Sequence, residues 1–159
     1  GFKVKHMMFT NVKGLFNDYS AEIDFNDDLK EANLQFEAKI NSIFTNNTDR
    51  DNHLKSADFF DAEQYPTLNF KSTKIEGNGS EYEITGDLTI KGITKPVTLN
   101  AEFSGLMTDP WGNTKAGFSF DGKIKRNDFG LNWNAALETG GVLVSDEVKI
   151  AGELQFVKA

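Results

Sequence analysis

Two histidines and a short acidic segment are the side chains of this sequence best suited to catalysis. His6 and His53 each stand alone, without a second histidine or a carboxylate at metal-ligand spacing on the same segment, so no metal site is predicted. His53 lies near Arg50, Asp51 and Asp58, where it could act as a base, but no nucleophile, orienting partner or glycine-rich phosphate loop accompanies it. A hydrogen-bonded histidine at the rim of the fold is the simpler interpretation, and we predict neither a catalytic residue nor a cofactor.

Arginine is used only twice, at Arg50 and Arg126, among the 17 basic residues. Such sparing use indicates specific placement, because the planar guanidinium binds a carboxylate or phosphate through two parallel hydrogen bonds. Arg126 shares the alternation of Ile124, so on a strand it would point inward, where together with His53 it could hold an anionic or carbonyl head group. The alternative is that both arginines form structural ion pairs with nearby aspartates, Asp128 for Arg126 and Asp49 or Asp58 for Arg50.

Alternation of apolar and polar residues runs through almost the whole chain, which is typical of β-strands with one buried face. It predicts eight strands, over residues 2–8, 11–26, 31–43, 66–75, 80–91, 94–107, 115–126 and 143–157. Turn residues such as Gly77-Asn78-Gly79 and Lys91-Gly92 separate them. The fold class is therefore all-β, and residues 1–159 form a single domain. Because no helix is long enough to cover the apolar faces, we expect the antiparallel sheet to close into an eight-stranded barrel, with a β-sandwich as the alternative.

Two short helical inserts interrupt the strands, near residues 48–60 and 132–138. Thr48 and Asp51 resemble a capping box, so a helix is predicted to begin at Thr48, with a second turn capped by Ser56. The other insert contains Trp133. We expect the first insert to lie at one mouth of the barrel, and the second to be the other long connection.

Five of the apolar faces carry a glycine in register, namely Gly14, Gly86, Gly105, Gly122 and Gly152. Missing side chains would leave a lumen open along the axis of a barrel whose interior is otherwise just filled. The alternative is that glycines let the strands bend. By the same alternation, the predicted lining of the lumen is Phe16, Phe36, Ile40, Phe70, Ile84, Leu88, Leu99, Phe103, Phe118, Phe120, Ile150 and Leu154, with room provided by Gly86, Gly122 and Gly152.

Composition excludes several partners. The net charge is −7, with 24 acidic and 17 basic residues, so nucleic acid would be repelled. No run approaches the roughly 20 apolar residues of a membrane-spanning helix.

The chain opens directly in alternation at Phe2, so we expect that the first strand is trimmed. Because no export segment is visible, a cytoplasmic location is expected over a periplasmic or secreted one.

Several stretches, taken in order, resemble the bacterial YceI-like family: Val4-Lys5-His6-Met7-Met8, Arg50-Asp51-Asn52-His53-Leu54, Gly86-Asp87-Leu88-Thr89-Ile90 and Ile124-Lys125-Arg126-Asn127-Asp128-Phe129-Gly130. The resemblance implies an extended lipocalin-like barrel that encloses a polyisoprenoid, such as an isoprenoid quinone or a polyprenyl phosphate. It also implies a carrier or storage role linked to isoprenoid metabolism or stress, no established reaction, and pairing as a homodimer.

Three function classes remain open at this point. A lipid carrier predicts an apolar ligand and a cavity well above a few hundred Å³. An enzyme acting on a lipid-like substrate predicts an ionisable group, such as His53, Asp51 or Asp58, that faces the cavity with a displaced pKa. A solid-cored structural or stress protein predicts no cavity and an apolar surface patch instead.

Overall fold

The computed structural model describes residues 2–3, 8–9, 14–24, 28–131 and 147–158. Its strands are β1 (Phe2–Lys3), β2 (Met8–Phe9), β3 (Gly14–Phe16), β4 (Tyr19–Asp24), β5 (Asn33–Lys39), β6 (Ile43–Phe44), β7 (Thr67–Asn78), β8 (Glu81–Ile90), β9 (Ile93–Thr108), β10 (Thr114–Lys125) and β11 (Glu147–Lys158). One α-helix, α1 (Thr48–Lys55), and three 3-10 turns, η1 (Leu29–Glu31), η2 (Ile40–Ser42) and η3 (Arg126–Phe129), complete the described part of the chain.

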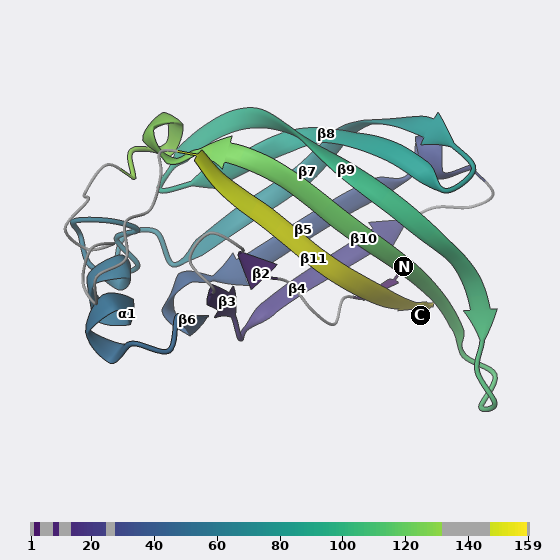
Figure 1. Ribbon diagram of the computed structural model, residues 1–159, viewed down its shortest axis with the longest axis horizontal. Helices are drawn as coiled ribbons and strands as arrows, with labels where there is room; N and C mark the ends of the chain where they lie inside the picture. Colours follow the sequence, from purple (N-terminus) through teal and green to yellow (C-terminus); the bar gives the residue numbers. More distant parts are fainter. Residues whose placement is uncertain (1, 4–7, 10–13, 25–27, 132–146, 159) are drawn as a thin grey trace.

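The strands form a nearly closed antiparallel barrel (Figure 1). Their order is β1-β4-β5-β7-β8-β9-β10-β11, and β1 pairs with both β4 and β11, so the two ends of the sheet meet. The small strands β2, β3 and β6 continue from β11 on the same sheet. The predicted all-β antiparallel barrel is therefore confirmed over the β-sandwich.

The first three predicted strands each appear as two shorter strands, β1 with β2, β4 with β3, and β5 with β6. Polar residues cause the breaks that the structure describes. The backbone N–H of Asn17 donates to the carbonyl of Ser42 (3.0 Å), and that of Lys39 donates to the carbonyl of Asp18 (2.9 Å). The Ser42 hydroxyl also donates to the carbonyl of Lys39 (2.6 Å), which closes turn η2. The strand paths are kept, and the second and third of them are interrupted at Asn17-Asp18 and at turn η2.

Two bulges shift the alternation within the long strands. β9 carries an extra residue, Ser104, so that Phe103 pairs with Phe118 but Gly105 pairs with Gly117. Because Gly117 lies between the buried positions of β10, the prediction that Gly105 continues the inward face is wrong. In β7 the extra residue is Thr73, after which Ile75 pairs with Ile84 and returns to the interior.

The interior is apolar and rich in phenyl rings. Phe118 lies at the centre of one group, with its ring 4.9 Å from that of Phe103, 5.6 Å from that of Phe120 and 5.6 Å from that of Phe156. Phe16, on the other side of the interior, meets the ring of Phe60 at 6.5 Å. The first group joins the neighbouring strands β9, β10 and β11, and the Phe16–Phe60 contact joins β3 to the turn that follows α1.

Helix α1 is held by a cluster of buried polar groups. The helix begins at Thr48 as predicted, but its N-cap is Asn47 rather than Thr48, because the Asn47 side chain accepts from the N–H of Arg50 (2.9 Å). Arg50 donates through Nε to the hydroxyl (2.9 Å) and through Nη2 to the carbonyl (2.8 Å) of Thr45. The Asp51 carboxylate accepts from the Thr45 N–H (2.9 Å). Arg50 is thus a structural clamp, but its partner is a threonine rather than the predicted aspartates.

The second predicted helical turn is a hydrogen-bonded turn instead. Ser56 ends α1, and the N–H of Phe59 donates to its carbonyl (3.0 Å). The insert predicted near residues 132–138 lies outside the described residues.

Replacing Gly86 by alanine should destabilise the fold. A Cβ at Gly86 would lie 2.5 Å from Cζ of Phe70 and 2.6 Å from the carbonyl oxygen of Lys71. The ring can turn aside, but the carbonyl belongs to the β7–β8 ladder, so we expect a loss of about 1–3 kcal/mol in the free energy of unfolding, measured by urea denaturation. Gly117→Ala is the matched control, because the nearest atoms to its Cβ belong to Ser104 at 3.4 Å. Equal stability of the two variants would contradict the prediction.

Candidate functional site

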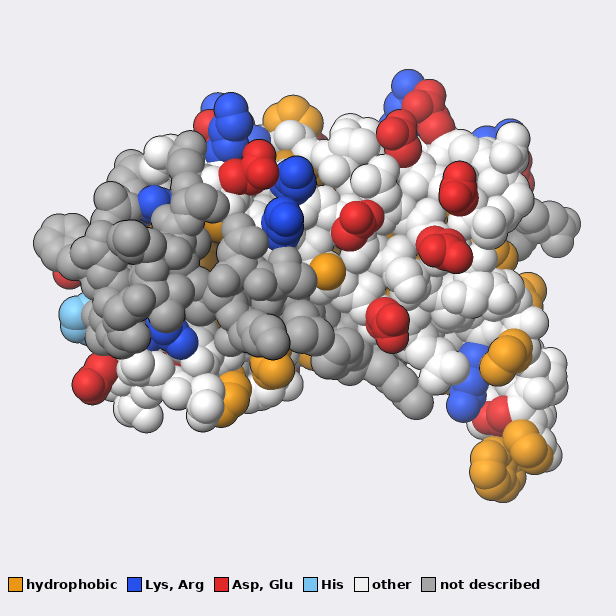
Figure 2. Space-filling model, viewed as in Figure 1, with side chains coloured by type: hydrophobic (Ala, Val, Ile, Leu, Met, Phe, Trp, Pro, Cys, Tyr) orange, Lys and Arg blue, Asp and Glu red, His pale blue; other side chains and the backbone are white. Residues whose placement is uncertain are grey.

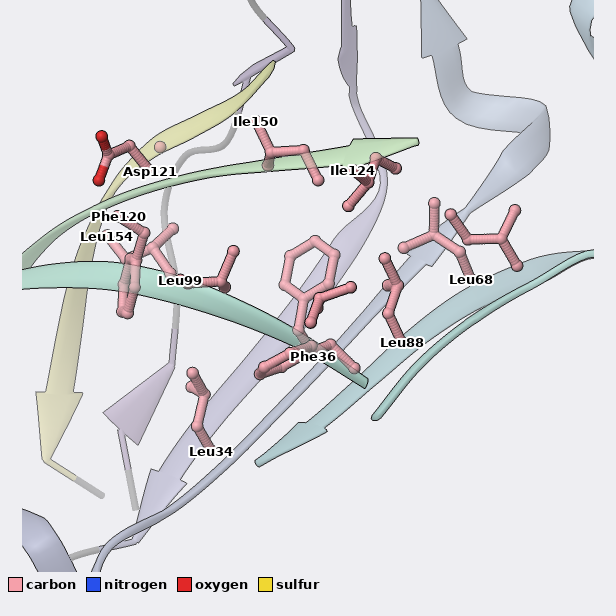
Figure 3. Close-up of a pocket in the computed structure, with 14 residues that line it drawn as sticks. Leu34, Phe36, Leu68, Leu88, Leu99, Phe120, Asp121, Ile124, Ile150 and Leu154 are labelled. Carbon is pink, nitrogen blue, oxygen red and sulfur yellow. The ribbon is translucent and has the colours of Figure 1, made fainter. Parts of the chain in front are cut away.

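A cavity of about 80 Å³ lies inside the barrel, between strands β5, β7, β8, β9, β10 and β11 (Figure 3). Figure 3 shows the labelled apolar side chains of these strands reaching toward a common space. Its lining consists of Leu34, Phe36, Leu68, Phe70, Leu88, Ile90, Val97, Leu99, Phe120, Asp121, Ile124, Ile150, Gly152 and Leu154. Asp121 is the single ionisable residue in this lining, and its carboxylate points away from the cavity in Figure 3.

About half of the predicted lining residues border this cavity. They are Phe36, Phe70, Leu88, Leu99, Phe120, Ile150, Gly152 and Leu154. The others lie elsewhere in the interior: Phe16, Ile40, Ile84, Gly86, Phe103, Phe118 and Gly122. Phe103 and Phe118 are stacked on each other, and Phe16 packs on Phe60 near α1, so these rings fill the ends of the barrel rather than its middle.

Six lining residues were missed. Leu34, Leu68, Ile90, Val97 and Ile124 follow the same alternation as their predicted neighbours. The alternation therefore marked these residues as inward-facing, but it did not indicate how far along the barrel axis each one lies. Asp121 is exposed and stands out of phase with the inward positions, so no pattern in the sequence would have found it.

The glycines on the inward face make room for neighbouring side chains. The space above Gly86 is taken by the ring of Phe70, and the space above Gly122 by Leu99, whose Cδ2 would lie 2.5 Å from an added Cβ. A ring lying over a strand glycine is a known way of stabilising that position. Since Phe70 and Leu99 both line the cavity, these glycines let large side chains lie back against the wall. They enlarge the lumen only indirectly.

The cavity is smaller than a lipid carrier was expected to show. Its volume of about 80 Å³ lies below the roughly 300–1,000 Å³ typical of sites for drug-sized ligands. The reason is the ring group of Phe103, Phe118, Phe120 and Phe156, which occupies the adjoining part of the interior. A long ligand would have to displace some of these side chains.

Neither predicted head-group residue borders the cavity. Arg126 is buried, with 6% of its surface exposed, and its Nη1 donates to the carbonyl of Leu131 (2.8 Å). Arg126 comes two residues after Ile124, which does line the cavity. The guanidinium-bearing residue therefore lies near the end of the apolar space. His53 is exposed on α1, and its position gives no support to a head-group role.

The ionisable groups proposed for an enzyme are placed elsewhere. Asp51 is buried, but its carboxylate is engaged by Thr45, and Asp58 is exposed. Tyr19 stacks on the cavity residue Phe36 with ring centroids 6.0 Å apart, and burial raises the pKa of its phenol. Its hydroxyl therefore stays protonated at neutral pH and can donate a hydrogen bond.

The described residues also contain neither a cluster of metal-binding side chains nor a membrane-spanning helix. No group of three or more His, Cys, Asp or Glu side chains there is arranged to hold a metal ion. Within those same ranges, no helix has the length and apolar character needed to cross a bilayer.

Comparison with known proteins gives consistent results over the whole chain. A family described as "YceI-like domain" matches residues 1–156. A UPF0312 protein of Photorhabdus laumondii is 43% identical over 130 residues, which are 81% of this chain and 68% of that protein. The protein YceI of Escherichia coli is 43% identical over 132 residues, 82% of this chain and 69% of that protein.

Solved structures show the same likeness. The YceI protein of Campylobacter jejuni is 41% identical, with a TM-score of 0.81, covering 100% of this chain and 92% of that one. BcnA of Burkholderia cenocepacia is 25% identical, with a TM-score of 0.79, over 97% of this chain and 95% of that one. A polyisoprenoid binding domain from Saccharophagus degradans, 15% identical with a TM-score of 0.65 over 99% of this chain and 98% of that one, shares the fold.

Replacing Arg126 by methionine should destabilise the protein. The substitution keeps the buried length of the side chain but removes the donor to the Leu131 carbonyl. Since hydrogen bonds from a charged group contribute about 1.5–3 kcal/mol, we expect a loss of that order in the free energy of unfolding, measured by urea denaturation. Lys125→Met is the matched control, because Lys125 is exposed. If the two variants unfolded at the same urea concentration, the structural role of Arg126 would be refuted.

Proposed function

The chain belongs to the YceI-like family, and from that premise we propose that it binds a long apolar isoprenoid lipid inside its barrel, as a carrier or store rather than as an enzyme. The ligand would be of the isoprenoid quinone or polyprenyl phosphate type. The observation that carries this proposal is the cavity itself, which six strands line with apolar side chains and whose one carboxylate points outward. The solved polyisoprenoid binding domain with the same fold adds support.

An isoprenoid suits this lining because its affinity needs little polar recognition. Each buried CH₂ contributes about 0.8 kcal/mol before the costs of ordering are subtracted. Ten buried carbons would therefore give roughly 8 kcal/mol before these costs, which sets about micromolar strength as the upper limit for a chain of that length. Longer chains have more apolar surface to bury, so the ordering costs can be offset.

The ligand must enlarge the cavity as it enters. Phe103 is only half-buried, so its ring is less tightly enclosed than the fully buried rings of the interior. Phe120 lies at the boundary between the cavity and the ring group, stacked on Phe118 with an angle of 22° between the ring planes. Movement of this ring would join the cavity to the space beyond it.

A direct test is native mass spectrometry of the purified chain, followed by organic extraction. We expect a bound apolar species of defined mass, and uptake of one molecule of a quinone or polyprenol by the delipidated protein. A chain that carries no lipid and takes up neither probe would overturn the proposal. Native spectra also report the oligomeric state, and homodimer formation stays a prediction.

Replacing Gly122 by alanine should weaken ligand binding more than it weakens the fold. The added Cβ would lie 2.5 Å from Cδ2 of Leu99 and 3.4 Å from the nearest backbone oxygen. The flexible end of Leu99 can yield, and it would then project into the cavity that it lines. We expect about a tenfold loss of affinity for ubiquinone, equivalent to roughly 1.4 kcal/mol, by native mass spectrometry titration.

Gly117→Ala, on the same strand but out of phase with the buried positions, is the control and should bind as the parent protein does. Unchanged affinity of the Gly122 variant would show that the ligand does not occupy this cavity.

A further inference from the structure

The hairpin that joins β9 to β10 projects beyond the rest of the barrel (Figure 1). The last pair between β9 and β8 is Glu102 with Glu81, and the last pair between β10 and β11 is Lys115 with Val157. Residues 104–114, which we call the hairpin tip, therefore have no pairing partner in β8 or β11; within the hairpin, Thr108 pairs with Thr114 and Met107 with Lys115. Neighbouring strands cover this tip on neither side.

The hairpin tip carries most of the large exposed apolar side chains of the described residues. Trp111 is 84% exposed, Met107 64% and Leu106 56%. The remaining one, Phe44, is 46% exposed and lies on β6. Figure 2 shows hydrophobic side chains gathered at the end of the projecting hairpin. Such a concentration on one protruding element marks an interaction surface.

The turn that presents Trp111 is tightly hydrogen-bonded. The Asp109 carboxylate accepts from the N–H groups of Asn113 (2.9 Å) and Trp111 (2.9 Å), and its other oxygen accepts from Nδ2 of Asn113 (3.2 Å). The hydrogen bonds from Asn113 hold the pKa of Asp109 below its usual value. The carboxylate is also 3.5 Å from Nζ of Lys115. Trp111 is thus displayed on an ordered turn whose polar side chains, Asp109 and Asn113, already hydrogen-bond within the turn.

We propose that the hairpin tip inserts into the interface of a lipid bilayer without net charge, so that the barrel takes up or delivers its ligand there. This inference rests on the proposed function. Tryptophan favours the boundary between head groups and acyl chains, where its ring is apolar and its N–H stays hydrated. A fluid bilayer can surround a protruding point on all sides, whereas a protein partner would need a matching pocket.

The area of the hairpin tip argues against a second copy of the chain as the occupant. Three side chains of this size, partly exposed, can bury on the order of 400 Å². A stable protein interface buries about 800 Å² on each partner. Insertion into lipid has no such minimum area.

The charge of the hairpin tip points to a neutral bilayer. Asp109 and Lys115 are the ionisable residues in and beside it, and they form an ion pair. The whole chain carries a net charge of −7, so an anionic membrane would repel it. The protein should therefore prefer zwitterionic lipid, the reverse of proteins that dock through basic patches.

Phenyl rings connect the cavity with the base of the hairpin tip. Phe120 lines the cavity, Phe118 stacks on it at 5.6 Å, and Phe103 stacks on Phe118 at 4.9 Å. Phe103 comes directly before the bulge at Ser104, where the tip begins. An apolar molecule entering from the bilayer would thus meet apolar surface at each step toward the cavity.

The test measures binding to phosphatidylcholine vesicles by co-sedimentation. We expect the parent protein to bind them, and to bind vesicles containing phosphatidylglycerol more weakly. Trp111→Ala should lose at least tenfold in vesicle affinity, while Phe44→Ala, which removes the exposed ring of β6, should retain it. Binding that increases with phosphatidylglycerol content, or a Trp111→Ala variant that binds as the parent does, would overturn the inference.

Uptake of a polyprenol from solution, followed by native mass spectrometry, separates this inference from the proposed function. Trp111→Ala should take up the polyprenol from solution as the parent does, because Trp111 does not line the cavity. If the parent protein takes up polyprenol but does not bind vesicles, the membrane-docking inference is refuted and the carrier proposal stands. If it binds vesicles but no polyprenol, the carrier proposal fails. If Trp111→Ala loses uptake from solution, Trp111 belongs to the ligand site, which also overturns docking as its role.

Discussion

A nearly closed ring of eight strand paths encloses a space that its own inward side chains nearly fill, and this limit on interior volume constrains the rest of the structure. Two of the large inward side chains lie over glycines of the neighbouring strand. Gly86 provides the space for Phe70, and Gly122 provides it for Leu99. The cavity exists because these two side chains lie against the wall instead of across the lumen. The paired large and small residues, rather than the glycines alone, therefore determine its size.

The bulge at Ser104 lets strand β9 both line the interior of the barrel and form part of the projecting hairpin. Up to Phe103, β9 alternates in step with the barrel and contributes Val97 and Leu99 to the cavity. After the extra residue Ser104 the alternation changes phase, and the strand leaves its partner β8. A strand in perfect register would have continued around the barrel; the bulge instead sends a two-stranded ribbon outward. The same element thus lines the interior and carries the exposed hairpin tip.

Much of this organisation can be read from the sequence because alternation is a local property. Local sequence patterns are enough to predict four features: the strand paths, the apolar interior, the short helix after residue 47 and the inward position of Arg126. The level of each residue along the barrel does not, because it depends on strand tilt and on bulges such as that at Thr73. Ile84 and Ile90 have the same alternation, yet only Ile90 lines the cavity. Likewise, the partner of Arg50 is Thr45, which no charge pattern could identify.

The small volume of the cavity and a carrier role are compatible if the phenyl rings beside the cavity can move. Phe103, Phe118 and Phe120 are stacked at 26° and 22° between successive ring planes. Near-parallel rings can slide along one another without opening a void at each step. Phe156, by contrast, meets Phe118 nearly edge-on at 85° and is fully buried, so it forms a fixed base. An apolar chain that replaces stacked rings exchanges one set of dispersion contacts for another, and the net cost is mainly the ordering of the ligand. In the proposed carrier, the stack fills this part of the empty barrel and would give way to a molecule of similar apolar character.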